Sequence, residues 1–333
     1  MDVSLVIPGR NAAATLRRCL DSVAPLLRQG ELREVLFVDD GSTDETAAIA
    51  AEYPVRLVRT GGLGPGGARN LGWRAARGKA VWFIDADCVP EPDALRLLKQ
   101  HLDTPGVAGV GGSYANIRGE SLLPSLIHEE IRERHLAMTG TVDYLGSFNV
   151  LYRREVLERI GGFDERHFNA PGAPGGEDAD LSYRISDLGL ALHFEPLALV
   201  GHHHPVRLAG YLRSQRLHGG WGVRLYARHP RRARGNSYSS WADHVQPPLA
   251  VVLLMALPTL LFPATRLLAP ALALALTALQ LPMTARLIRR TGRWRYLLFV
   301  PMSVVRAVAR GVGLVQGTVR LLWDRPAPVA RSA

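Results

Sequence analysis

Lysine and cysteine are scarce in this sequence of 333 residues. Arginine supplies all of the 40 basic side chains except Lys79 and Lys99, and the formal net charge is +10. The two cysteines, Cys19 and Cys88, show no spacing typical of metal or redox sites, so we expect reduced, buried thiols in a cytosolic domain. Zinc-finger, RNP-type and basic-zipper patterns are also missing, which argues against a nucleic-acid partner. The positive charge instead indicates contact with phosphate or anionic lipid, with genome composition as the alternative.

A signal peptide is missing as well. Met1-Asp2 leads directly into a strand pattern at residues 3–7 rather than into a charged segment and a long apolar one. We therefore expect the N-terminal domain to lie in the cytoplasm, and the charge pattern described next favours the inner face of the cell membrane.

Charge is nearly absent between residues 249 and 285, where Arg266 separates two apolar stretches. A membrane-spanning helix needs roughly 17–25 residues, so 249–264 is short and 267–285 is adequate. We predict a membrane helical hairpin, with a buried hairpin in a soluble domain as the alternative. Arginines crowd the segment that follows, which favours both hairpin ends on the cytoplasmic side: they are Arg286, Arg289, Arg290, Arg293 and Arg295. Residues 297–323 predict an amphipathic helix at the membrane surface, with a third span as the alternative.

Residues 1–235 alternate strand and helix patterns and form the first predicted domain; the membrane region covers 245–325. We expect strands at residues 3–7, 34–38, 55–58, 80–84, 107–110, 149–152, 192–194 and 197–200. We expect helices at residues 12–27, 68–76, 93–101, 154–160 and 180–187, and one that is capped by Ser42 or Thr43 and ends at residue 51. Alternation of this kind predicts an α/β fold with a mostly parallel sheet, in which ligands bind at the carboxyl ends of the strands.

Acidic side chains stand at two of those strand ends. Asp85 and Asp87 form an Asp-x-Asp motif after the fourth strand, where two carboxylates can serve a ribose and a hard cation such as Mg²⁺ or Mn²⁺. Such a cation offsets the charge of a departing diphosphate. Asp39 and Asp40 follow the second strand, and one of them is expected to accept hydrogen bonds from a nucleobase or ribose.

A glycine-rich run at residues 61–67 precedes Arg69. Its backbone amides can approach a phosphate, and Arg69 can pair with that phosphate. The run fits neither the Walker A spacing nor the dinucleotide fingerprint.

Two further groups complete the candidate site. Glu177 and Asp178 offer a carboxylate base for an acceptor hydroxyl, whereas Asp180 is expected to belong to a helix start. His202 and His204 can share one side of a strand, so either of them is a candidate metal ligand opposite Asp87.

As an ordered set, these motifs resemble the inverting family 2 glycosyltransferases of the GT-A fold, over about residues 1–225. The matching pieces are Val6-Ile7-Pro8, Val38-Asp39-Asp40-Gly41-Ser42-Thr43-Asp44, Gly66-Gly67-Ala68-Arg69-Asn70, Phe83-Ile84-Asp85-Ala86-Asp87, Phe148-Asn149-Val150-Leu151-Tyr152-Arg153-Arg154, Gly161-Gly162-Phe163-Asp164-Glu165 and Gly176-Glu177-Asp178.

The resemblance implies a metal-dependent, hexosyltransferase-type enzyme with a site residue in nearly every motif. Asp178 is implied as the catalytic base and Asp87 as a metal ligand together with His202 or His204. The residues implied to bind the nucleotide sugar are Pro8, Asp39, Asp40, Arg69, Asp85, Asn149, Glu177 and Arg216. Processive members carry a Gln-x-x-Arg-Trp motif, and the segment from Gln215 to Trp221 has these residues at another spacing. We therefore expect transfer of a single sugar.

The predicted function is transfer from a nucleotide-diphosphate sugar to an acceptor hydroxyl, on a lipid-linked or cell-envelope glycan precursor, with membrane lipids as further partners and Mg²⁺ or Mn²⁺ as cofactor. The alternatives are a sugar-nucleotide nucleotidyltransferase and a catalytically inactive membrane adaptor. The nucleotidyltransferase requires a lysine in a glycine-rich signature soon after the first strand, and Gly9-Arg10-Asn11-Ala12 does not supply it.

Overall fold

The computed structural model describes residues 1–117, 121–168 and 175–323, and the chain forms two compact units. The first unit comprises Met1–Val206 and Asn236–Ser239, and the second comprises Arg207–Gly235 and Ser240–Ala333. The first predicted domain ends at residue 235. In the structure the chain enters the second unit at Arg207, returns to the first unit for residues 236–239, and then enters the second unit again.

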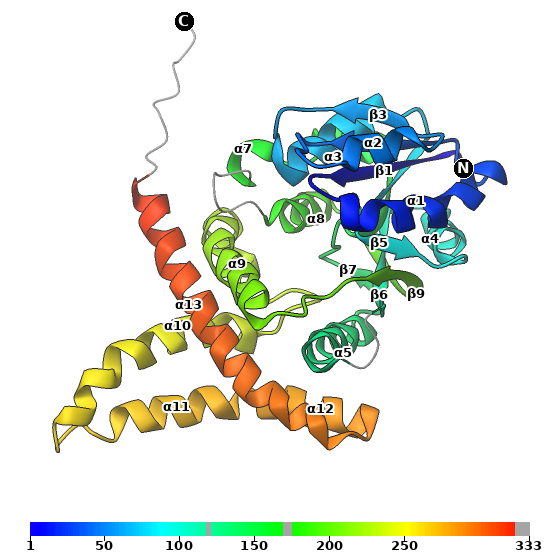
Figure 1. Ribbon diagram of the computed structural model, residues 1–333. Coiled ribbons are helices and arrows are strands. Elements are labelled where there is room, and N and C mark those ends of the chain that lie inside the picture. The colour runs from blue at the N-terminus through cyan, green and yellow to red at the C-terminus, as the bar shows by residue number, and fades with distance from the viewer. Residues whose placement is uncertain (118–120, 169–174, 324–333) are drawn as a thin grey trace, which may run out of the picture. The chain divides into compact units, whose positions relative to one another are not determined.

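Within the described residues, one nine-stranded sheet organises the first unit (Figure 1). Its strands are β1 (Val3–Gly9), β2 (Glu34–Asp39), β3 (Arg56–Arg59), β4 (Ala80–Ile84), β5 (Cys88–Pro90), β6 (Val107–Asn116), β7 (Gly140–Val142), β8 (Asn149–Arg153) and β9 (Ala191–His202). Their order is β3-β2-β1-β4-β8-β6-β9-β5, and β7 pairs with β9.

The half of the sheet built from β1 to β4 is parallel, as the alternating strand and helix patterns predict. Strand β8 then runs antiparallel to both β4 and β6, which makes the whole sheet mixed. The carboxyl ends of β1, β2 and β4 therefore lie along one edge, where the register pairs Gly9 with Asp39.

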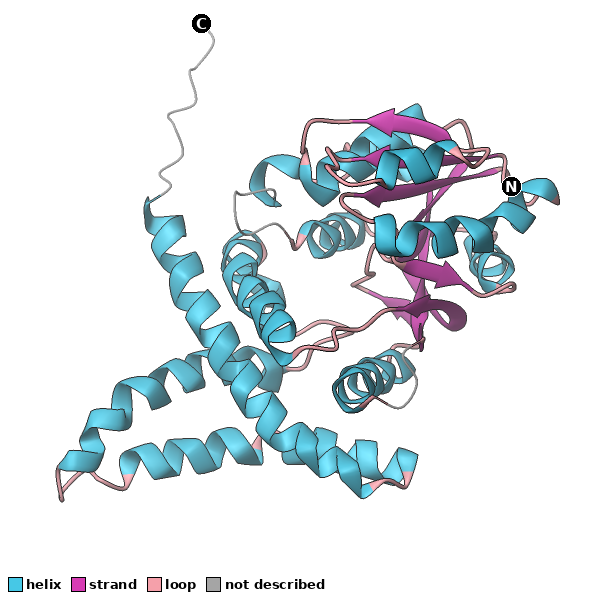
Figure 2. Ribbon diagram, in the orientation of Figure 1, coloured by secondary structure: helices cyan, strands magenta, loops and turns pink. Residues whose placement is uncertain are grey.

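Helices cover both faces of this sheet (Figure 2). They are α1 (Ala13–Arg28), α2 (Thr46–Ala51), α3 (Gly64–Ala75), α4 (Ala94–Leu102), α5 (Leu122–Ala137), α6 (Arg154–Ile160), α7 (Glu165–Phe168) and α8 (Glu177–Asp187). One core holds the apolar sides of α1 and α4, and the other holds those of α3, α6 and α8. In α1, the buried positions Leu16, Cys19, Leu20 and Val23 follow the helical repeat that the sequence shows.

Several expectations from the sequence need correction. The predicted cap of α2 at Ser42 or Thr43 is wrong: those residues bond to Asn11, and Asp44 instead accepts hydrogen bonds from the backbone and hydroxyl of Thr46. Helix α2 therefore begins three residues later. The two expected strands at 192–194 and 197–200 are one strand, β9, whose pairing with β6 shifts register between Glu195 and Leu199.

The second unit is helical in its described residues. It contains α9 (Leu208–Arg228), η1 (Pro230–Arg234), α10 (Trp241–Ala256), η2 (Leu257–Leu261), α11 (Leu268–Ala278), α12 (Leu281–Thr291), η3 (Trp294–Leu298) and α13 (Phe299–Trp323). Three stretches of these helices are long and apolar enough to cross a membrane, judged by length and composition: Trp241–Leu261, Leu268–Thr291 and Trp294–Trp323.

Glycines join α9 to α13 inside the second unit. A Cβ atom on Gly219 would overlap the backbone oxygen of Arg310, and one on Gly313 would overlap that of Arg216. A Cβ atom on Gly317 would meet the backbone of Gly220 in the same way. The two helices therefore touch backbone to backbone, which only glycine permits at these positions. Gly219 and Gly220, which lie between Arg216 and Trp221 in this segment, thus have a packing role.

Candidate active site

The carboxyl ends of β2 and β4 carry the predicted aspartates. Asp40 is fully engaged in the local fold: its Oδ1 accepts hydrogen bonds from Thr60 Oγ1 and the backbone N–H of Leu63, and its Oδ2 accepts one from the N–H of Gly64. It holds the glycine-rich loop at the start of α3. Asp39 accepts one hydrogen bond, at Oδ1 from the N–H of Ser42. In the part of the chain that the structure describes, Asp39 Oδ2 has no such bond, so Asp39 is the better placed of the two for a ligand.

Arg69 connects two distant motifs. Its Nη2 lies 2.7 Å from Oδ1 of Asp85, and its Nη1 lies 2.9 Å from Oε1 of Glu177. The guanidinium also lies 5.7 Å from the ring centre of Phe163. Helix α3 thereby ties the Asp-x-Asp motif after β4 to the Glu-Asp pair that begins α8.

Two buried polar atoms at this junction, Arg69 Nε and Glu177 Oε2, have no hydrogen-bond partner within the described residues. Buried polar atoms without a hydrogen-bond partner cost folding free energy in a protein core, but they are common where a ligand binds. The side chain of Asp85, in contrast, is 35% exposed and can meet a ligand directly.

Burial raises the proton affinity of the Glu-Asp pair. The pKa of Glu177 rises to about 7, chiefly because the carboxyl is buried, while Arg69 opposes the rise and Asp178 adds to it. Burial also raises the pKa of Asp178, and Arg69 and the backbone N–H groups of Ala179 and Ser147 oppose that rise. A carboxylate with a raised pKa suits the removal of a proton from a hydroxyl.

Asp178 is fixed by its neighbours in the first turn of α8. Its Oδ1 accepts the N–H of Ala179 at 2.8 Å, and the hydroxyl of Tyr144 lies 3.4 Å from its Oδ2. Asp180, two residues on, pairs with Arg184 at 2.7 Å and is fully buried, which agrees with the structural role predicted for it.

The second aspartate of the Asp-x-Asp motif faces the histidines at the end of β9. Asp87 Oδ2 lies 3.4 Å from Nε2 of His202, and the Asp87 side chain is 40% exposed. Nδ1 of His202 lies 3.3 Å from Nδ1 of His204, so the two imidazoles share a side as predicted. Behind them, Nε2 of His204 lies 3.3 Å from Nδ1 of His128 on α5.

Burial and neighbouring charges shift the pKa values of Asp87 and His204. Burial raises the pKa of Asp87, but the hydrogen bond and charge of His202 outweigh it and leave the pKa below its usual range. Burial and the neighbouring imidazoles lower the pKa of His204 to about 3. A carboxylate and imidazole nitrogens are a suitable donor set for Mn²⁺ and, through the carboxylate, for Mg²⁺.

Aromatic rings connect the group formed by Asp87, His202 and His204 to Asp178. Tyr114 packs 4.7 Å from the ring of His202 and stacks at 3.6 Å on Phe148. Further ring contacts lead on to Tyr144, whose hydroxyl points at Asp178: Phe148 to His135, His135 to Tyr238, and Tyr238 to Tyr144. The candidate base and the candidate metal ligands therefore border one continuous aromatic cluster.

Three predicted binding residues lie elsewhere. Pro8 is buried within β1, opposite Val38. Asn149 is fully buried; its Oδ1 accepts from Trp82 and its Nδ2 donates to the backbone oxygen of Ala198. Arg216 is on α9, in the second unit. The contacts of Pro8 and Asn149 are internal to the fold, and nucleotide-sugar binding by all three stays a prediction.

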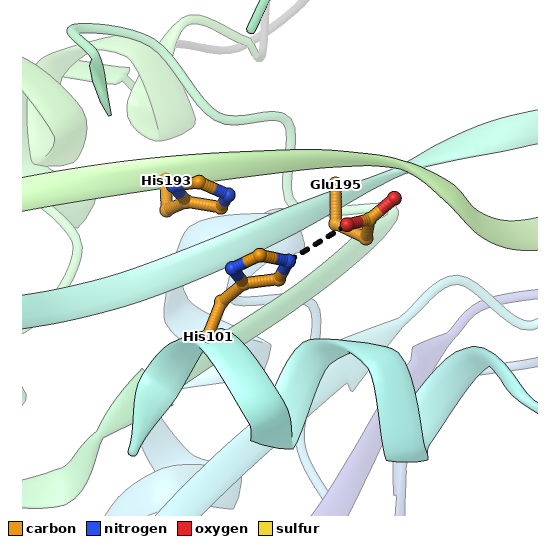
Figure 3. Close-up of side chains that lie close together, drawn as sticks. All are labelled: His101, His193 and Glu195. Atoms are coloured by element: carbon orange, nitrogen blue, oxygen red, sulfur yellow. Dashed lines mark hydrogen bonds and ion pairs between the residues drawn. The ribbon is translucent and has the colours of Figure 1, made fainter. Parts of the chain in front are cut away.

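A separate histidine group on α4 and β9 has metal-type side chains (Figure 3). His101 Nε2 lies 2.7 Å from Oε2 of Glu195, and the ring of His101 stacks on that of His193 with centres 4.0 Å apart and planes 21° apart. An imidazole nitrogen binds a metal ion about 2 Å away and in the plane of its ring. Because the two stacked rings lie in nearly parallel planes, one ion cannot lie in both planes at that distance from each nitrogen. In this conformation the group is an ion pair beside a stacked ring.

Reasoning from sequence missed the contributions of α5. Its buried side carries His128, Glu130 and His135 among apolar residues, so the helix lacks a clean apolar repeat. The aromatic residues Tyr114, Tyr144 and Tyr238 belong to no motif in the sequence, and only the fold brings them together.

Comparison with known proteins agrees with this fold. Residues 4–161 match the family described as Glycosyl transferase family 2. The pre-mycofactocin glycosyltransferase of Mycobacterium tuberculosis is 32% identical over 241 residues, which are 69% of this chain and 48% of that protein. The succinoglycan biosynthesis protein ExoO of Rhizobium meliloti is 35% identical over 160 residues, 46% of this chain and 44% of that protein. The chain thus spans about half the length of these relatives.

Among solved structures, a mannosyltransferase from Pyrobaculum calidifontis has a TM-score of 0.59 at 22% identity, and the match covers 97% of this chain and 87% of that one. This likeness establishes the fold. The N-terminal part of the chain is a GT-A domain of glycosyltransferase family 2, and long apolar helices follow it.

Proposed function

We propose that the protein is an inverting, metal-dependent glycosyltransferase that moves one sugar from a nucleotide-diphosphate sugar to an acceptor hydroxyl at the cytoplasmic membrane face. The observation that carries the proposal is the double ion pair of Arg69, which brings Asp85 and the Glu177-Asp178 pair together from segments about a hundred residues apart. A structural role alone does not explain the orphaned buried atoms at this junction.

The residues divide the reaction among them. Asp39 and Asp85 are placed to accept hydrogen bonds from the nucleoside, and Arg69 offers positive charge next to the diphosphate. Asp87 and His202 would hold Mn²⁺ or Mg²⁺, which supplies charge where the diphosphate departs. The mannosyltransferase from Pyrobaculum calidifontis was solved with GDP-mannose and Mn²⁺, which supports a nucleotide sugar and a divalent cation as the ligands proposed here.

Asp178 acts as the base. The acceptor oxygen forms a bond to the anomeric carbon from the face opposite the diphosphate, the bond between that carbon and the phosphate oxygen breaks, and the acceptor proton passes to the Asp178 carboxylate. A single displacement of this kind inverts the anomeric centre. The aromatic cluster beside Asp178 offers the acceptor an apolar surface.

The second unit supports a membrane location. Its sequence holds 19 arginines, no lysine and only two acidic residues, Asp243 and Asp324, whereas the first unit has more acidic than basic residues. Exposed Trp241, Trp294 and Trp323 stand at ends of the apolar stretches, as is common at membrane interfaces. Anionic lipid headgroups complement such a charge, and a lipid-linked or cell-envelope precursor is the acceptor that a membrane enzyme meets.

The packing of α13 bears on the number of spans. It lies against α9, whose 21 residues include Arg213, Arg216, Arg224 and Arg228. A helix paired along such an arginine-rich partner suits the membrane surface better than the bilayer core, where each arginine is costly. This supports a two-helix anchor from residues 241–291 with α13 as a surface helix.

Nucleotide release tests the proposal. We would incubate the full-length protein in detergent or vesicles with UDP-, GDP- and dTDP-sugars, with Mn²⁺ or Mg²⁺, and identify the product. Nucleoside diphosphate release that Asp87→Asn abolishes supports transfer; Asp93→Asn, an exposed aspartate paired with Arg96, is the matched control. Pyrophosphate as the product identifies a nucleotidyltransferase instead. No release with any donor, together with full cellular function of Asp87→Asn and Asp178→Asn, identifies an inactive adaptor.

A further inference from the structure

Four side chains from three elements form an unbroken line behind the candidate metal position. Asp87 contacts His202 at 3.4 Å, His202 contacts His204 at 3.3 Å, and His204 contacts His128 at 3.3 Å. His128 is 6% exposed and His204 is 2% exposed, so water does not replace these contacts. His128 is the one member that comes from α5.

The hydrogen atoms in this line have one consistent arrangement when the imidazoles are neutral. The Asp87 carboxylate only accepts, so His202 donates through Nε2–H and its Nδ1 must accept. His204 then donates through Nδ1–H and accepts at Nε2. His128 therefore donates through Nδ1–H, and all donors point toward Asp87.

A cation on His202 Nε2 requires the opposite arrangement. Nε2 must then lack its hydrogen, which moves to Nδ1, so His202 becomes the donor toward His204. His204 in turn donates through Nε2–H, and Nδ1 of His128 must accept. The residue at position 128 therefore has to donate in one state and accept in the other, which imidazole does by exchanging tautomers.

We propose that His128 is a positioning residue for the divalent cation: through His204 it holds the His202 ring against Asp87 and allows its tautomer to change when the cation binds. The inference rests on the proposed function, because Asp87 and His202 are the ligands assigned there. Partners of this kind, one contact removed from a metal ligand, commonly affect metal affinity by about 10- to 100-fold.

Mn²⁺ binding by the full-length protein, followed by electron paramagnetic resonance of the free ion without nucleotide, tests the proposal. His128→Asn places an amide close to the position of Nδ1 and can donate or accept by rotation, so we expect affinity within about threefold of wild type. His128→Gln carries the same amide one methylene further out, beyond that position, and we expect an affinity loss of about tenfold or more.

Glu130→Gln is the matched control. Glu130 is also buried on α5, but its carboxylate pairs with Arg134 at 2.7 Å. We expect its Mn²⁺ affinity to equal that of wild type, which separates a local effect from general damage to α5. Equal affinity of His128→Gln and His128→Asn would overturn the proposal.

Asp87→Asn separates this inference from the proposed function. If Asp87→Asn loses Mn²⁺ binding while His128→Gln keeps it, only the role of His128 is refuted. If wild type and Asp87→Asn bind Mn²⁺ equally weakly, the metal assignment of the proposed function fails, and the inference fails with it.

Discussion

Arg69 and Glu177 are 108 residues apart in the chain, and their Nη1 and Oε1 atoms lie 2.9 Å apart in the protein interior. The same guanidinium binds Asp85, so one cation pairs with two carboxylates from distant segments of the first unit. Replacement by the uncharged Arg69→Met leaves both carboxylates without their cation. We expect a loss of about 3–5 kcal/mol in unfolding free energy, since an uncompensated buried charge remains.

Arg17→Met is the control for that experiment. Arg17 makes a bidentate pair with Glu52, but both side chains are about half exposed. Such a pair contributes at most about 1 kcal/mol. Thermal melting of the two variants in detergent should separate them clearly; equal melting points would contradict the stabilising role of the Arg69 junction.

The pH dependence of stability should report on Glu177. Its pKa is about 7 in the folded protein because of burial, against an ordinary value of 4.5. Between these values the folded protein keeps a proton that the unfolded chain has lost, so the contribution of Glu177 to stability falls as pH rises through this window. The expected loss is on the order of 3 kcal/mol between pH 4.5 and 7. Melting curves across this window and about one pH unit beyond it measure the loss.

Glu177→Gln should remove this contribution, because the amide does not titrate. The difference between its pH profile and that of wild type separates Glu177 from buried groups such as His204, whose lowered pKa acts in the opposite direction. Glu158→Gln, at an exposed glutamate paired with Arg154, should leave the profile as in wild type. Identical pH profiles of wild type and Glu177→Gln would show that Glu177 is ionised throughout this window.

Asp178→Asn should lower the rate of sugar transfer by about 10²- to 10⁴-fold, the usual contribution of a general base. Its melting point should stay near that of wild type, because an amide does not have the burial cost of a carboxylate. Asp180→Asn is the contrasting variant on the same helix: it weakens the buried pair with Arg184 and should lower the melting point. Comparable activity of Asp178→Asn and wild type would remove Asp178 from the mechanism.

In the second unit, Gly313→Leu should separate α9 from α13, because any side chain at this position overlaps the backbone of Arg216. We expect a loss of at least about 1–3 kcal/mol or aggregation in detergent. Val312→Leu, at the neighbouring exposed position, should have little effect. Detergent melting and size-exclusion profiles compare the two, and similar profiles would refute the backbone contact.

The regular part of the fold was predictable because its elements bury apolar side chains at simple periods. Strand β4 was predicted to the residue, and α1 and β2 to within a residue or two. Helix α5 was not, since buried polar groups such as His128 and His135 obscure its repeat. Motif spacing gave the candidate site residues, but no spacing shows that both carboxylate oxygens of Asp40 accept hydrogen bonds from the loop before α3 while Asp39 keeps one oxygen available.

The chain passes from the second unit into the first at Asn236 and leaves again after Ser239. Those four residues are bound into the catalytic unit: Asn236 Nδ2 donates to Tyr183 Oη at 2.7 Å, and the Ser237 backbone donates to Asp143 at 2.7 Å. A truncated chain ending at Val206 would lack them, and one ending at Ser240 would keep α9 while exposing the glycines that α13 covers. Because residues 236–239 belong to the first unit, no truncation at a single position keeps that unit complete without α9 and η1. A chimeric protein that joins the first unit to other membrane helices therefore needs a linker that carries residues 236–239 in place of α9 and η1.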